Sequence, residues 1–174
     1  MRFRSHSGSG CVDWGEESFM GRRITAFAAL GLAAALAGCA HEKVAVDGYR
    51  WAYLADDAEA PRLAYGRPNS DDVVLMISCR PGQDQVDVSA VGLTGGEIVL
   101  ASGRTESRFA AAKVDDALSQ GGFLEGRGKA SAPALDGFRK SGDLALLTKG
   151  ERHSLAADSA DRGRVRAFFK ACGV

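Results

Sequence analysis

The sequence has few of the residues that usually reveal a biochemical activity. Its 174 residues include three histidines, four cysteines and four prolines, and only 7% are aromatic. There is no excess charge of either sign, because 22 basic residues balance 22 acidic ones. Nucleic-acid binding requires clustered Lys and Arg, so we expect no nucleic-acid partner. The charges are also interspersed along the chain, which argues against adhesion to lipid through a basic patch.

Motifs for metals and cofactors are missing as well. No cysteine belongs to a C-x-x-C pair, and the acidic pairs near turns do not follow a calcium-loop pattern. The glycine-rich stretch Gly121 to Ser131 has the wrong spacing for a phosphate-binding loop, and Ala130 stands where such a loop needs Ser or Thr. We therefore expect no cofactor and no metal.

One apolar stretch stands out, from Ile24 to Ala40, and only Thr25 interrupts it. Arg22 and Arg23 precede it, and Leu36-Ala37-Gly38-Cys39 lies near its end. A positive start, a short apolar middle and small residues before a cleavage point are typical of an export signal. The alternative is a single membrane-spanning helix, but the stretch is short for a span and rich in weakly apolar Ala and Gly.

The tetrapeptide Leu36-Ala37-Gly38-Cys39 resembles the lipobox of bacterial lipoproteins. In that class the cysteine sulfur receives a diacylglycerol and the cysteine becomes the first mature residue. The resemblance implies that Cys39 is lipidated and that its acyl chains anchor the protein to a membrane of the cell envelope. Ala40, rather than an acidic residue, follows the cysteine, which implies an outer-membrane anchor facing the periplasm rather than the inner membrane.

We divide the chain into four segments. Residues 1–19 contain three acids that do not suit an export leader, whereas Met20 is followed by a normal one, so translation is expected to start at Met20. Residues 20–38 are then the signal peptide and 39–48 a lipidated tether. Residues 49–174 are long enough for a single domain with a modest core.

Two cysteines follow Cys39, namely Cys79 and Cys172. Exported proteins reach oxidising compartments where such pairs form disulfides, so we expect these two to be bonded. The alternative is two separate buried thiols, which behave as small apolar side chains.

Short strand-like runs separated by turn residues fill most of the remaining chain. This pattern predicts an α+β, β-rich fold, a small antiparallel sandwich or barrel. Val73 to Cys79 is apolar almost throughout, as expected of a strand buried on both faces. The other expected strands are 49–54, 62–65, 86–90, 97–101, 104–110, 123–130, 143–148 and 151–156, and 111–120 is left as strand or helical turn.

Two helices complete the expected fold. The first spans Pro133 to Lys140, with Ser131 as its cap and Gly142 to stop it. The second closes the chain, capped by Asp158 or Ser159 and with Asp161 in its first turn. Its apolar stripe should lie on the sheet, where a bond from Cys172 to Cys79 would hold it; the stripe consists of Val165, Phe168, Phe169 and Cys172.

Catalytic residues are harder to find. His41 lies next to the anchor, and His153 has Ser154 beside it and Asp158 nearby, a possible set for a small periplasmic hydrolase. Adjacent strand residues point to opposite faces, however, so His153 and Ser154 are poorly placed for a shared proton. We expect no catalytic residues and a protein that is not an enzyme.

One further resemblance concerns Ser102-Gly103 and Lys149-Gly150. They are similar to the Ser-Gly and Lys-Gly loops of membrane-bound c-type lysozyme inhibitors, which insert toward the carboxylates of the lysozyme. The resemblance implies Ser102 and Lys149 as partner contacts. The sequence thus predicts a lipid-anchored, non-catalytic binding or structural module with an envelope protein or cell-wall partner, an inhibitor of a lysozyme-like wall hydrolase being the first alternative and a hydrolase the second.

Overall fold

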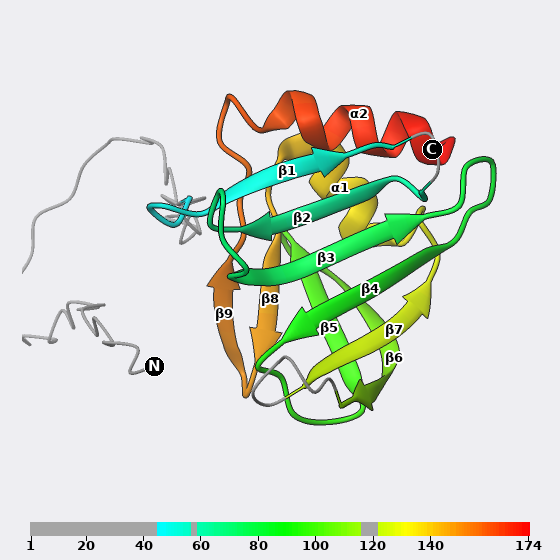
Figure 1. The fold of residues 1–174 in the computed structure, drawn as a ribbon. Coiled ribbons are helices and arrows are strands. Elements are labelled where there is room, and N and C mark those ends of the chain that lie inside the picture. Colours follow the sequence, from blue (N-terminus) through cyan, green and yellow to red (C-terminus); the bar gives the residue numbers. More distant parts are fainter. Residues whose placement is uncertain (1–44, 57–58, 116–121) are drawn as a thin grey trace, which may run out of the picture. The chain divides into compact units, whose positions relative to one another are not determined.

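The computed structural model describes residues 45–56, 59–115 and 122–174, and Figure 1 shows their fold. The predictions made for the start site, the signal peptide, His41 and lipidation of Cys39 lie outside these ranges. No helix among the described residues has the length and apolar character needed to cross a membrane.

Within these described ranges, nine strands form one antiparallel sheet with the order β1-β2-β3-β4-β7-β6-β5-β8-β9. The expected β-rich architecture is therefore confirmed, and its form is a half-barrel with two helices. The strands are β1 (Arg50–Leu54), β2 (Arg62–Gly66), β3 (Val73–Cys79), β4 (Val86–Val91), β5 (Glu97–Ser102), β6 (Thr105–Val114), β7 (Phe123–Gly128), β8 (Ala145–Thr148) and β9 (Glu151–Ser154).

The sheet turns a corner along β6, its longest strand. The first part of β6 pairs with β5 and its last four residues pair with β7. Glycines in β7 make the crossing possible, since a Cβ at Gly126 would lie 2.9 Å from the Ala110 carbonyl and one at Gly128 would lie 2.5 Å from the Phe109 ring. Small residues at such a corner let the two halves of a sheet approach closely.

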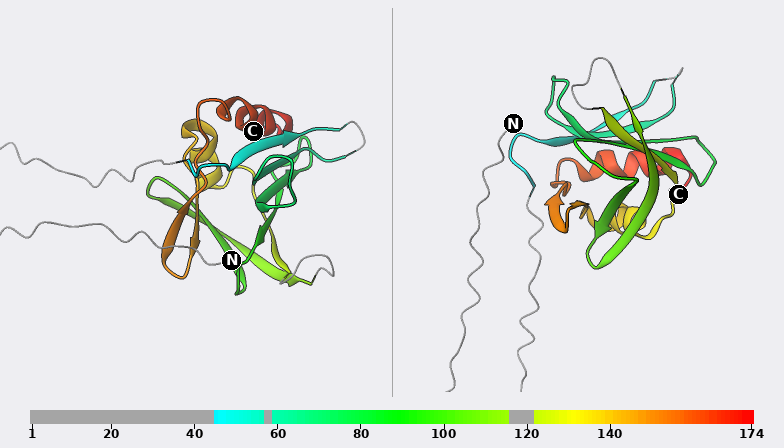
Figure 2. Two further views of the ribbon diagram at one scale, coloured as in Figure 1. Left: turned by 60° about the vertical axis from the view of Figure 1, so that its left-hand side comes forward. Right: turned by 90° about the horizontal axis from the view of Figure 1, so that it is seen from below.

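The two helices lie inside the curve of the sheet (Figures 1 and 2). Helix α1 (Pro133–Ser141) packs on β5 and β6, while α2 (Arg162–Cys172) packs on β1 and β2 and touches α1. The predicted apolar stripe of α2 is fully buried, as are Leu135 and Phe138 of α1. The core therefore lies between the helices and the concave face of the sheet.

The disulfide joins Cys79 at the end of β3 to Cys172 at the end of α2, with the two Cα atoms 5.7 Å apart. Both cysteines are buried in the core. The predicted link between the last helix and the sheet is confirmed.

Three local predictions are wrong. In β3 the side chains alternate, with Leu75, Ile77 and Cys79 buried and the residues between them half-buried, because none of the described elements covers the convex face of the sheet. The cap position of α1 is Ala132 rather than Ser131, because the Ser131 hydroxyl donates to Asp84 instead.

Helix α2 begins at Arg162, and Asp161 is its cap residue rather than part of its first turn. The Asp161 carboxylate makes no capping hydrogen bond to the helix. It accepts a hydrogen bond from the backbone N–H of Trp51 in β1 instead. The Asp158 carboxylate accepts a hydrogen bond from the Asp161 backbone N–H at 2.8 Å.

Candidate functional site

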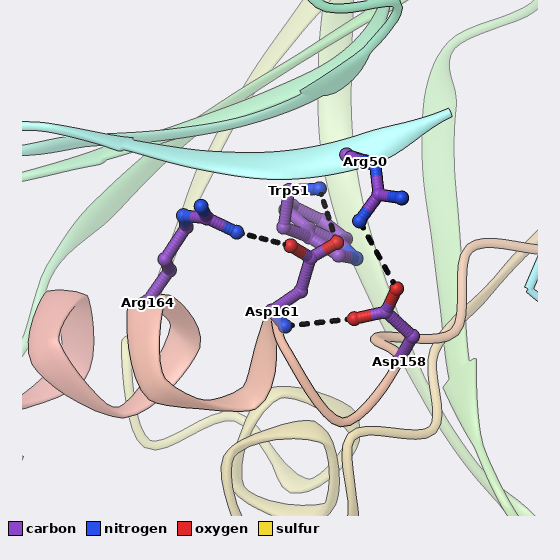
Figure 3. Close-up of polar contacts among 5 residues, drawn as sticks. All are labelled: Arg50, Trp51, Asp158, Asp161 and Arg164. Atoms are coloured by element: carbon purple, nitrogen blue, oxygen red, sulfur yellow. Dashed lines mark hydrogen bonds and ion pairs between the residues drawn. The ribbon is translucent and has the colours of Figure 1, made fainter. Parts of the chain in front are cut away.

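The most connected polar cluster of the described residues lies where β1 meets the start of α2 (Figure 3). Asp161 is only 2% exposed, and one of its carboxylate oxygens accepts the backbone N–H of Trp51 at 2.9 Å. The other oxygen pairs with the Arg164 guanidinium one turn along the helix. Each carboxylate oxygen is thereby satisfied, which a buried carboxylate requires.

A second, more exposed pair extends this cluster. The Arg50 guanidinium lies 3.3 Å from the Asp158 carboxylate, and both side chains are at least one-third exposed. The indole N–H of Trp51 donates to the Leu155 carbonyl at 2.8 Å. Together these contacts hold β1, an edge strand of the sheet, against the segment that connects β9 to α2.

A shallow groove of about 380 Å³ lies beside the cluster. Its floor is mostly apolar, and three arginines line it, Arg50, Arg67 and Arg164. Each arginine is paired with an aspartate, since Arg67 lies 3.4 Å from Asp72. Because the cations are neutralised within the fold, the groove has little net charge with which to select an anionic ligand.

Tyr49 closes one side of the same region. Its hydroxyl donates to Asp72 at 2.8 Å, and the Arg67 guanidinium lies 5.2 Å from the centre of its ring. Its ring also stacks on Tyr65 at 5.8 Å, and Tyr65 packs on Trp51 at 5.1 Å. The polar cluster is thus continuous with the aromatic core, which indicates that it supports the fold.

The structure does not bring Ser102 and Lys149 together. Ser102, at the end of β5, is 7% exposed and its hydroxyl would lie 2.7 Å from a Cβ placed on Gly137 of α1. Lys149 is exposed, at the turn between β8 and β9, with a left-handed backbone. The register of β5 with β8 places the two residues beyond opposite ends of β8, about 17 Å apart along the strand direction.

His153 lies on the exposed face of β9, 3.9 Å from Glu151, and Ser154 is on the other face. The Ser154 hydroxyl accepts the Ala156 backbone N–H at 3.4 Å. Within the described ranges, no group of three or more His, Cys, Asp or Glu side chains is placed to hold a metal ion. The residues considered for a hydrolase therefore do not form a catalytic arrangement here.

Sequence reasoning placed Asp161 as a favourable charge for the helix dipole and missed its contact with β1. No local signal could reveal that contact, because its two partners are 110 positions apart. Comparisons with protein-family models, with curated proteins and with solved structures find no match for this chain.

Proposed function

We propose that this protein is a lipoprotein of the bacterial cell envelope, anchored through Cys39, and that its folded domain is a non-catalytic binding or structural module. The observation that carries this proposal is the Cys79–Cys172 disulfide. Structural disulfides are made and kept in exported proteins and are rare in the bacterial cytosol. The bond therefore supports export, which the apolar stretch before Cys39 would direct.

The same disulfide bears on the anchor. Of the four cysteines, it occupies two, and Cys11 precedes the expected signal peptide. Cys39 is then the only cysteine of the mature chain left to carry a lipid. The first strand begins at Arg50, eleven residues later, so the domain has room for a tether between it and the acyl chains. We place the anchor in the outer membrane, facing the periplasm.

The non-catalytic part of the proposal is supported by the state of the polar side chains. The buried carboxylate of Asp161 is used to hold β1, and the arginines of the adjacent groove are paired with aspartates. Carboxylates and guanidinium groups that are paired within the fold in this way stabilise it and are not free to act on a substrate. A protein of this kind would act by contact with an envelope protein or with the cell wall.

Metabolic labelling tests the anchor directly. Cells producing the chain are grown with radiolabelled palmitate, and the label should enter the protein and be lost in Cys39→Ser, which should also move from the membrane to the soluble periplasmic fraction. Cys11→Ser is the matched control and should keep both label and membrane fractionation. Label that is absent from the wild-type chain, or that persists in Cys39→Ser, would overturn the proposal.

A second candidate function is inhibition of a lysozyme-like wall hydrolase, through Lys149 alone. Lys149 is the exposed tip of the β8–β9 hairpin and lines a groove of about 460 Å³ with Thr148 and Gly150. A cation on a narrow turn can enter a cleft lined by carboxylates. Inhibition of lysozyme that Lys149→Ala abolishes and Arg104→Ala leaves intact would support it, and an inert wild-type protein would exclude it.

A further inference from the structure

The outer face of α2 is strongly basic. Arg162, Arg166 and Lys170 follow one another at i, i+4 and i+8, and all three are exposed. Because that spacing places side chains on one side of a helix, the three cations form a stripe opposite the buried apolar stripe. The charges appear interspersed along the sequence as a whole, so only the helical repeat and the fold gather them. The interspersed charges of the sequence therefore do not argue against adhesion of this helix to lipid.

None of these three side chains forms an ion pair with a described residue. This distinguishes them from Arg50, Arg67 and Arg164, each of which has an aspartate partner. The first turn of α2 also contains no acidic residue. A cation such as Arg162 near a helix N-terminus is unfavourable to the helix dipole, so helix stability does not explain its presence.

The end of α1 enlarges this surface. Arg139 and Lys140 line a crevice between the helices together with Arg162 and Arg166. Asp136 pairs with both Arg139 and Lys140, so these two cations together retain one net positive charge. We call the five cations Arg139, Lys140, Arg162, Arg166 and Lys170 the basic face. With Asp136 it carries four net positive charges in a chain whose formal net charge is zero.

On α2, the long basic side chains of the basic face alternate with small residues, as in helices that bind flat surfaces. Three residues that follow these cations on α2 are small, namely Gly163, Ala167 and Ala171, and the one other exposed residue of the helix, Arg164, pairs with Asp161. Small side chains let the long basic ones reach a flat surface without obstruction. No groove large enough for a folded partner is needed for such contact, and the crevice at the basic face is narrow.

The face also lies close to the point where the tether joins the domain. Helix α2 packs on β1, and Figure 1 shows the two elements side by side at the same edge of the fold. Arg50, the first residue of β1, is eleven residues after Cys39. Even fully extended, those residues span only about 38 Å, so a lipidated Cys39 would keep the start of β1 within that distance of the bilayer, with α2 packed on that strand.

We propose that the basic face binds the anionic headgroups of the phospholipid bilayer in which the protein is anchored. This inference rests on the proposed envelope location. Each cation near an anionic leaflet raises the binding constant for that leaflet about fivefold. The attraction falls off within a Debye length. The tether supplies proximity, and the basic face orients the domain so that α2 faces the bilayer and the convex face of the sheet points away from it.

The experiment uses the proposed mature chain, residues 39–174, carrying Cys39→Ser. This chain lacks the apolar export segment and cannot be acylated, so binding by the basic face is separated from other membrane attachment. Its co-sedimentation is measured with phosphatidylcholine vesicles that contain or lack phosphatidylglycerol, at low and high salt. We expect preference for the anionic vesicles at low salt and its loss at high salt. Adding Arg166→Gln and Lys170→Gln should reduce that preference by about 30-fold, since two cations are removed.

The matched control is Arg104→Gln with Lys149→Gln, which removes two exposed cations from turns at other places in the fold. The control should keep the preference; equal loss in both double variants, or no preference in the parent chain, would overturn the inference. If anionic vesicles bind the chain but wild-type Cys39 takes up no palmitate, the proposed anchor fails while the basic face stands. If palmitate is incorporated but the preference is absent, only the basic face fails.

Discussion

The backbone N–H of Trp51 donates a hydrogen bond to the buried carboxylate of Asp161, at 2.9 Å and across 110 positions of the chain. The contact ties the first strand of the sheet to the residue from which the last helix starts. Edge strands present unpaired N–H groups that invite association with other strands. Asp161 satisfies one such group, and the Trp51 ring packs into the core against Phe138 at 4.8 Å.

Asp161→Ala should lower the free energy of unfolding by about 2 kcal/mol, because the Trp51 N–H would be left buried without an acceptor. Asp161→Asn keeps one acceptor oxygen and should lose less. Urea denaturation followed by Trp fluorescence measures both. Arg50→Gln is the control, since it breaks only an exposed ion pair and should change stability by less than about 1 kcal/mol. Equal losses in Arg50→Gln and Asp161→Ala would contradict the role given to Asp161.

Loss of the disulfide should destabilise the domain more than any other single change. The two cysteines are 93 positions apart, and closing a loop of that length stabilises by about 4 to 5 kcal/mol in the chain-entropy model. Cys79→Ala with Cys172→Ala should therefore shift the urea midpoint strongly downward. A reducing agent should do the same to the wild-type protein and leave the double variant unchanged. Unfolding midpoints of wild-type protein that are identical with and without reductant would contradict this prediction.

Stability should fall in acid in part through Asp84. Hydrogen bonds from the Ser131 hydroxyl and backbone N–H hold the pKa of the Asp84 carboxyl below its ordinary value. Since the folded state favours the ionised form, this contribution is present above the ordinary pKa of about 4 and is lost as pH falls through the lowered pKa. The stability difference between wild type and Asp84→Asn should therefore be constant at neutral pH and shrink in acid.

Denaturation midpoints over a series of pH values measure that difference. Ser131→Ala is the companion variant, because it removes the hydroxyl donor and leaves the backbone donor, and should reproduce part of the effect. In the double variant Asp84→Asn with Ser131→Ala, the second substitution should lower the free energy of unfolding little further. A difference between wild type and Asp84→Asn that does not depend on pH would contradict the prediction.

Alkaline pH should act through Tyr65. Burial raises the pKa of its phenol to about 12. Because the folded state favours the neutral phenol, the contribution of Tyr65 to the free energy of unfolding is complete below the ordinary pKa of about 10. It is lost as the pH rises toward 12. A titration of tyrosinate absorbance should show a late step accompanied by unfolding.

Tyr65→Phe should remove that late step from the titration. Among the described residues the Tyr65 hydroxyl has no hydrogen-bond partner, so the variant should keep or slightly raise stability at neutral pH. A late step that survives in Tyr65→Phe would assign it to another group.

Most elements of the fold could be predicted because their causes are local. Pro133 at the start of α1 and Gly142 at its end, with a left-handed backbone, act within one turn of the helix. The buried stripe of α2 follows from a repeat that is visible in the sequence. Two of the failed predictions share one cause. Ser131 was expected to cap α1 and Asp161 to lie in the first turn of α2, but each side chain has a partner distant in sequence, Asp84 and Trp51 respectively.

The sequence by itself determined the strands, the helices, the pairing of the last two cysteines and the expectation of an anchor at Cys39, because each depends on residue type at short spacing or on a count of thiols. Only the tertiary structure decided which polar groups meet. It separated Ser102 from Lys149 along β8 and tied Asp161 to β1. It also gathered Arg162, Arg166 and Lys170 on one surface of α2, where none of them has an ion-pair partner among the described residues. The physical reason is that the direction of a side chain follows from the local backbone, while its partner depends on how distant elements pack.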